Sequence, residues 1–140
     1  MTAPLDRYAA FWETLTPDGV EALDAVAAPD FRFVDPFNDV AGRAAVKGIL
    51  RHMFETLEVA RFAVTDRAMG QGAGFLKWTF DYRVRGRAIA GTIVGVSEVR
   101  FGADGLATAH VDHWDAASQL YERVPVLGGV LRMVKRRLSA

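Results

Sequence analysis

The sequence predicts an α+β protein in which helices precede a strongly curved, mostly antiparallel sheet and cover its concave face. Apolar residues recur at helical spacing through roughly the first 60 residues, interrupted by one short alternating segment, and from residue 61 onward the pattern changes to long alternating runs. Short glycine-bearing connections (GQGAG, RVRGR and FGADG) separate these runs, as expected of antiparallel hairpins. Helices and strands that are segregated along the chain in this way favour α+β over alternating α/β architecture.

The first two elements are predicted to be helices. Tyr8 and Trp12 lie one turn apart on the apolar face of the first segment, which places both side chains in the core. A second helix is expected to begin at Pro17, with Thr16 as its N-cap, because proline suits the first helical position and threonine suits the cap. This helix must end by Pro29.

A short strand and a third helix follow. Alternation from residue 31 sends Phe31, Phe33 and Asp35 to one face, and Pro36 ends the strand. An aspartate beside two aromatic rings either satisfies itself in the Asp-Pro turn or lies in a cavity and does chemistry, and taken alone the turn is favoured. The helix after the AGR turn carries one apolar stripe: Val46, Ile49, Leu50, Met53, Phe54 and Leu57.

Four strands are predicted over residues 61–69, 74–85, 87–101 and 106–114. Gly91 and Gly95 lie inside the third of them, where glycine usually marks a bulge, a bend or a close approach of another group. From about residue 120 we expect a basic, amphipathic helical extension of a single domain that spans residues 1–140.

The composition narrows the classes of function. Seventeen basic and seventeen acidic residues give no net charge, which argues against binding nucleic acid through a global field. The absence of cysteine excludes disulfides, thiolate metal sites and cysteine nucleophiles. No segment has the apolar length of a membrane span or the pattern of a signal peptide, so we expect a soluble cytoplasmic protein.

From about Leu5 to Asp115 the chain resembles the nuclear-transport-factor-2-like superfamily, and within it the ketosteroid-isomerase-like and SnoaL-like polyketide cyclase branches. The resemblance rests on element order and on four short motifs: DRY with Tyr8, VDPF with Asp35, the AGR turn, and HVDHWD in the last strand. It implies a bent cone with a deep pocket, and a homodimer.

The resemblance also suggests roles for individual residues. Tyr8 falls where the isomerases have a tyrosine that donates a hydrogen bond to the substrate oxyanion, and Asp35 falls where they have the general base. Their oxyanion hole is completed by a protonated aspartate, and here Ser97 stands at about that position. This departure weakens the case for ketosteroid isomerisation. SnoaL-like polyketide cyclases use a pocket aspartate as acid or base without a cofactor.

Alternation places His110, Asp112 and Trp114 on one face of the last strand, which by analogy faces the pocket. The polar groups expected there are Tyr8, Asp35, His110 and Asp112, and these are the candidate catalytic residues. The candidate ligand-binding residues are Trp12, Phe33, Trp78, Phe80, Ser97 and Trp114. His110 and Asp112 could equally form a satisfied structural pair. No metal site is expected, because His113 points to the opposite face, and His52 is expected at the surface.

We therefore expect a protein that binds a small hydrophobic molecule and that catalyses proton transfer without a cofactor, as an isomerase, cyclase or dehydratase, with Asp35 as the base. The alternative is a non-catalytic binding or dimerisation module of the same fold. A homodimer is expected through the outer face of the sheet. The C-terminal helix is expected to pack over the cone or against a second subunit, in preference to a membrane surface.

Overall fold

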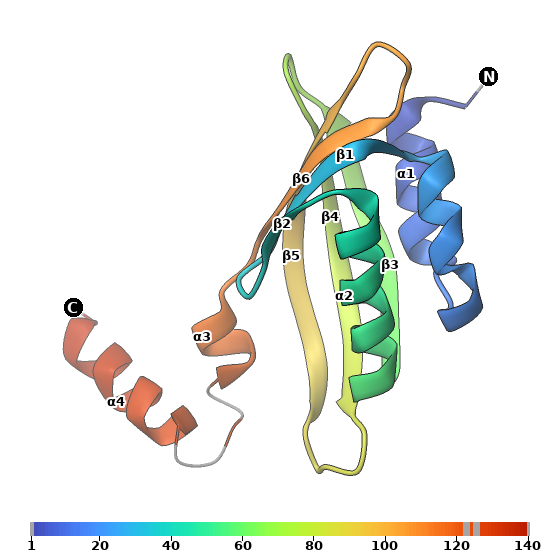
Figure 1. Ribbon diagram of the computed structural model, residues 1–140. Helices are drawn as coiled ribbons and strands as arrows, with labels where there is room; N and C mark the ends of the chain where they lie inside the picture. Colours follow the sequence, from blue (N-terminus) through green and yellow to red (C-terminus); the bar gives the residue numbers. More distant parts are fainter. Residues whose placement is uncertain (1, 122–123, 125–126, 140) are drawn as a thin grey trace.

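The computed structural model describes residues 2–121, 124 and 127–139. It is an α+β structure in which one open, strongly bent sheet carries the helices (Figure 1). The strands lie in the order β2-β1-β6-β5-β4-β3. All neighbours are antiparallel except β1 and β6, which run parallel. The predicted fold class is confirmed.

Helix α1 spans Pro4–Glu13 and buries Tyr8 and Trp12 as predicted. The second helical segment, η1 (Pro17–Ala25), is a 3₁₀ helix. Val20 and Leu23, together with Val26 at its C-cap, recur every three positions, which suits three residues per turn. Thr16 occupies the N-cap position, as predicted, although its side chain makes no capping hydrogen bond.

Strand β1 (Ala27–Val34) begins four residues earlier than predicted, before an exposed Pro29. The chain then turns at Asp35 and returns as β2 (Asp39–Ala41), a short edge strand that the sequence did not reveal. On its other side β1 pairs with β6 (Ala107–His113), which sets Phe33 directly opposite His110. This parallel pairing joins the strands that come first and last in the sequence.

The rest of the sheet is the predicted four-strand meander: β3 (Leu57–Met69), β4 (Gly74–Val84), β5 (Ala90–Phe101) and then β6. Gly95 of β5 lies opposite Trp78 of β4. A Cβ atom at position 95 would come within 2.5 Å of the Trp78 ring, so this glycine makes room for an indole that crosses the sheet surface.

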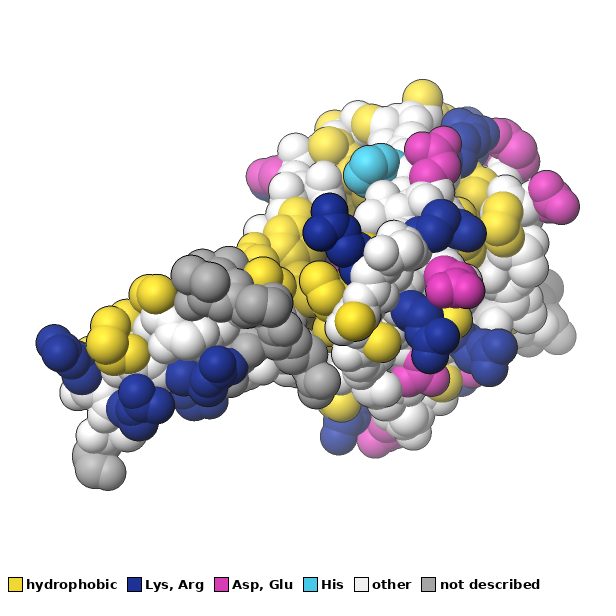
Figure 2. All heavy atoms as spheres, turned by 90° about the horizontal axis from the view of Figure 1, so that it is seen from below, with side chains coloured by type: hydrophobic (Ala, Val, Ile, Leu, Met, Phe, Trp, Pro, Cys, Tyr) yellow, Lys and Arg dark blue, Asp and Glu magenta, His cyan; other side chains and the backbone are white. Residues whose placement is uncertain are grey.

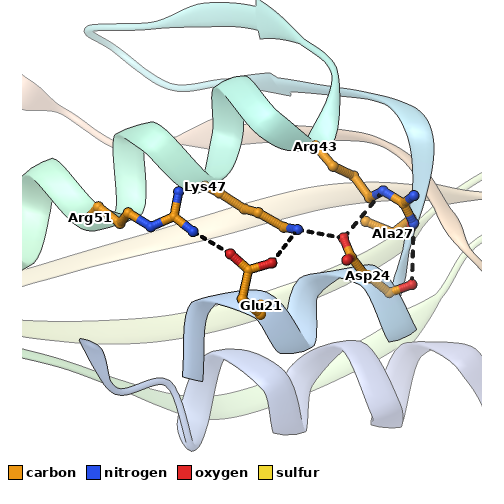
Figure 3. A network of polar contacts seen from close by, with 6 residues as sticks. All are labelled: Glu21, Asp24, Ala27, Arg43, Lys47 and Arg51. Carbon is orange, nitrogen blue, oxygen red and sulfur yellow. Dashed lines mark hydrogen bonds and ion pairs between the residues drawn. The ribbon is translucent and has the colours of Figure 1, made fainter. Parts of the chain in front are cut away.

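Helix α2 (Arg43–Thr56) runs alongside the long strands and is fixed to η1 by ion pairs (Figures 1 and 3). Lys47 Nζ lies 2.7 Å from Glu21 Oε2 and 2.8 Å from Asp24 Oδ1. One turn to either side on α2, Arg51 pairs with Glu21 and Arg43 pairs with Asp24. These contacts hold in place a helix whose inner face closes the concave side of the sheet.

The chain ends with the short helix α3 (Ala116–Gln119) and with α4 (Leu127–Leu138). Helix α4 projects from the body, away from α2 and the sheet (Figures 1 and 2). Four of its apolar side chains are exposed, and its basic residues lie beside them: Val130, Met133, Val134 and Leu138, with Arg132, Lys135, Arg136 and Arg137. The helix therefore does not pack over the cone, which was one of the two expectations, while its packing against a second subunit stays a prediction. None of the described helices is long and apolar enough to cross a membrane.

Candidate functional site

A cavity of about 370 Å³ lies between α2 and the concave face of the sheet. Its size falls within the range of small-molecule sites, roughly 300–1,000 Å³. Most of its wall is apolar. The aromatic lining residues are Trp12, Phe33, Phe37, Phe62, Trp78, Phe80, Tyr82 and Trp114. Helix α2 and the residue after it add the aliphatic side chains Ile49, Leu50, Met53 and Leu57.

Strand alternation explains why the predicted wall residues meet here. Trp78 and Phe80 are two apart on β4, so both point to the concave face, and Phe33 does the same on β1. Trp12, Ser97 and Trp114, also expected to contact a ligand, line the same cavity. Phe62 was not singled out from the sequence, although it stacks on Phe80 with 4.4 Å between ring centroids. Phe37 was missed because it lies in a turn with no periodic pattern.

A continuous chain of hydrogen bonds runs behind and along this wall. The Tyr8 hydroxyl lies 2.7 Å from His110 Nδ1, and His110 Nε2 lies 2.6 Å from Asp112 Oδ1. From the opposite side, Ser97 Oγ donates to the same Asp112 oxygen at 2.5 Å. Trp78 Nε1 in turn donates to Ser97 Oγ at 2.8 Å. Five residues from four elements thus form one polar chain.

The chemistry of the donor and acceptor groups sets the bond directions along this chain. The Trp78 indole can only donate, so the Ser97 hydroxyl accepts from it and gives its own proton to Asp112. At the other end, burial raises the pKa of the fully buried Tyr8 hydroxyl well above its ordinary value, which keeps this group protonated. A carboxylate can only accept, so the proton between His110 and Asp112 belongs to Nε2; in the neutral imidazole this leaves Nδ1 as an acceptor for the Tyr8 hydroxyl.

All donors of the chain consequently converge on one oxygen, Asp112 Oδ1. No described residue donates to Oδ2 of the same carboxylate, whose side chain is 15% exposed and lines the cavity. His110 is itself held rigidly, since it is 3% exposed and stacks on Phe33 at a ring distance of 4.7 Å. The site is thus a fixed carboxylate with one bound and one available oxygen.

Tyr8 differs from its expected role. It is fully buried and packs edge-on against three rings, those of Trp12, Phe31 and Phe101. Its hydroxyl is engaged by His110, so Tyr8 lies behind the cavity wall and is not placed to meet a ligand. Its contribution to the site is to orient His110.

Asp35 also lies at the cavity wall, but its carboxylate closes the turn between β1 and β2. Oδ1 accepts from the backbone N–H groups of Phe37 and Asn38 at 2.8 and 2.7 Å, and the Asn38 side-chain amide reaches both oxygens. This is the satisfied Asp-Pro turn that the sequence left open as the alternative. As a general base, Asp35 would have to give up these bonds.

The remaining histidines have different positions. His52 is exposed, as expected, but it also borders the cavity from α2, with Nε2 3.4 Å from the Thr56 hydroxyl. In the sequence, the only indication that His52 borders the cavity is its position two residues after Leu50, close to the apolar stripe of the helix. His113 points away from the cavity and lies 3.6 Å from Glu98. Within the described part of the chain, no group of acidic or histidine side chains is arranged to hold a metal ion.

Solved structures with the same fold come from several bacteria. An NTF2-like protein of unknown function from Burkholderia pseudomallei is 20% identical over 84% of this chain and 95% of its own, with a TM-score of 0.73. A protein with a ketosteroid isomerase-like fold from Catenulispora acidiphila, solved with trimethylamine, is 17% identical over 85% and 92%, with a TM-score of 0.70. A candidate SnoaL-like polyketide cyclase from Shewanella denitrificans is 17% identical over 86% and 96%, also at 0.70.

At these identities the likeness shows the fold alone. Among functionally curated proteins, none matches this chain. The model of one protein family, the SnoaL-like domain, matches residues 8–110, which extend from the buried tyrosine of α1 to the histidine of β6. Since this match spans most of the sequence and agrees with the cone of helices and bent sheet described above, the chain belongs to the SnoaL-like domain family.

Proposed function

We propose that this protein binds a small hydrophobic carbonyl compound in the cavity and catalyses proton transfer on it without a cofactor. The observation that carries the proposal is the state of Asp112. Two donors hold Oδ1, while Oδ2 is available at an apolar wall. A carboxylate that is fixed in orientation and largely shielded from water is a suitable general base.

In the proposed reaction, Asp112 Oδ2 removes a proton from the carbon next to the carbonyl group. The C–H bond breaks, an O–H bond forms on Asp112, and the electron pair moves onto the carbonyl oxygen to give an enolate. Return of the proton to another atom of the same molecule completes an isomerisation or a cyclisation. His110 and Ser97 donate to Oδ1 throughout, which keeps the carboxylate in one orientation.

This assignment differs from the one that the sequence favoured, in which Asp35 is the base. Asp35 holds the turn with at least three hydrogen bonds from Phe37 and Asn38, and a base must have a lone pair directed at its substrate. The role of Asp35 as base remains a second prediction. The homodimer through the outer sheet face remains a prediction as well.

The test is a screen of hydrophobic ketones and enones against the wild-type protein, followed by two variants on any substrate found. Asp112→Asn keeps the size of the side chain and removes the proton acceptor, so turnover should fall by about a hundredfold or more. Ligand affinity should change much less. Asp35→Asn should retain most of the activity. Loss of activity in Asp35→Asn with normal turnover in Asp112→Asn would restore Asp35 as the base.

A non-catalytic binding protein of the same fold predicts a different pattern. In that case none of the carbonyl compounds that bind would be converted, and Asp112→Asn would bind them as the wild type does. Isothermal titration and turnover measurements on the same compounds therefore separate the two functions.

A further inference from the structure

The charges around the cavity are all of one sign. Two carboxylates, those of Asp35 and Asp112, lie in its wall, and no lysine or arginine is found among the described residues that line it. The other titratable groups of the lining are His52, at the surface, and His110, buried against Phe33, together with the Tyr82 hydroxyl.

Neither carboxylate is paired with a described lysine or arginine. Asp112 is bound by the Ser97 hydroxyl and by Nε2 of His110. Asp35 is bound only by amide N–H groups. The ion pairs made by the described lysines and arginines include neither of them.

The wall between these carboxylates strengthens the effect. Phe33, Trp78 and Trp114 add apolar aromatic surface and no cationic group to the cavity wall. Apolar surroundings also screen a carboxylate poorly, so its field extends further than it would in water. An anion that entered would lose its hydration and meet no cation in return.

We infer that this cavity selects ligands by charge: it admits hydrophobic molecules that are neutral or carry a protonated amine, and it excludes those that carry a carboxylate or phosphate. The inference rests on the cavity being the ligand site of the proposed function. This charge selection narrows the candidate substrates. Free fatty acids and phosphorylated metabolites are excluded from the cavity, while neutral ketones and hydrophobic amines remain candidates.

The test uses three probes with the same aromatic body: 2-acetylnaphthalene, 1-(2-naphthyl)ethylamine and 2-naphthoate. At pH 7 they are neutral, cationic and anionic, and their affinities are measured by isothermal titration. The naphthoate should bind at least tenfold more weakly than the ketone, and the amine at least as tightly as the ketone. Because the site is partly buried, this order should persist at high salt.

The source of the order is tested with two matched variants. Asp112→Asn removes a charge from the wall and should reduce the difference between amine and naphthoate by about tenfold. Asp115→Asn removes a charge just outside the cavity, where asparagine can still cap α3, and should leave the order unchanged.

Naphthoate binding as tight as that of the ketone would overturn the inference, as would an order that is unchanged in Asp112→Asn. Failure of all three probes to bind would overturn both the inference and the proposed function. A preserved charge order without turnover of any ketone would leave the inference standing and overturn the catalytic proposal alone.

Discussion

Replacing Tyr8 with phenylalanine isolates one bond of the buried polar chain. The ring and its edge-on contacts with Trp12, Phe31 and Phe101 are retained, and only the hydroxyl is lost. His110 Nδ1 then loses its hydrogen-bond donor, and the His110 side chain is buried, with 3% of its surface exposed. Leaving a buried acceptor unsatisfied costs about 1–3 kcal/mol. For a chain of 140 residues the entropy of unfolding is about 0.3 kcal/mol/K, so Tm should fall by about 3–10 °C.

Urea unfolding measures the change in stability, and nitrogen NMR of the imidazole reports where the His110 proton resides. In the wild type the proton should be on Nε2, and in Tyr8→Phe part of it should move to Nδ1. Tyr121→Phe makes the same chemical change in a ring that packs on Phe37 and is not part of the buried hydrogen-bond chain. This variant should alter the free energy of unfolding by less than about 0.5 kcal/mol. If Tyr8→Phe unfolds like the wild type and His110 keeps its tautomer, the proposed role of Tyr8 is wrong.

Three further outcomes are expected. Gly95→Ala would place a Cβ atom 2.5 Å from the Trp78 ring and should destabilise the fold by about 1–3 kcal/mol, whereas Gly48→Ala on α2, where nothing lies within 4 Å, should be neutral or stabilising; chemical unfolding compares them. Lys47 holds the pKa values of its two carboxylate partners below their ordinary range, so Lys47→Met should be less stable than the wild type at pH 7. This contribution is present above the ordinary carboxyl pKa, about 4, and is lost as pH falls through the lowered values, so the two proteins should converge at low pH; a gap that persists there would contradict it. Light scattering should give twice the chain mass of 15.3 kDa if the homodimer forms, and a mass of 15.3 kDa would exclude it at the concentration used.

The sequence predicted those parts of the site that depend on local periodicity. Alternation on β4 and β6 placed Trp78, Phe80, His110 and Asp112 on the concave face, because a strand has only two faces. The second helix was predicted at the correct place, and the three-residue spacing of its apolar side chains suits the 3₁₀ geometry that the structure has there.

The contacts between distant segments could not be predicted in this way. Tyr8 and His110 are 102 residues apart, and nothing in either neighbourhood shows that their side chains meet. Asp35 illustrates the other limit. Its position at a strand end beside a proline is compatible with a base and with a turn, and only the positions of the Phe37 and Asn38 amides distinguish the two.

The parallel pairing of β1 with β6 also has a kinetic consequence. It sets Phe33 beside His110, although the two residues lie far apart in the sequence. The site therefore cannot form until the long loop between them has closed. Contacts of such high sequence separation slow folding, and the meander, whose neighbours are joined by short turns, can form earlier. During refolding, a ligand that binds the cavity should therefore report the last step of assembly, after most of the sheet has already gained its structure.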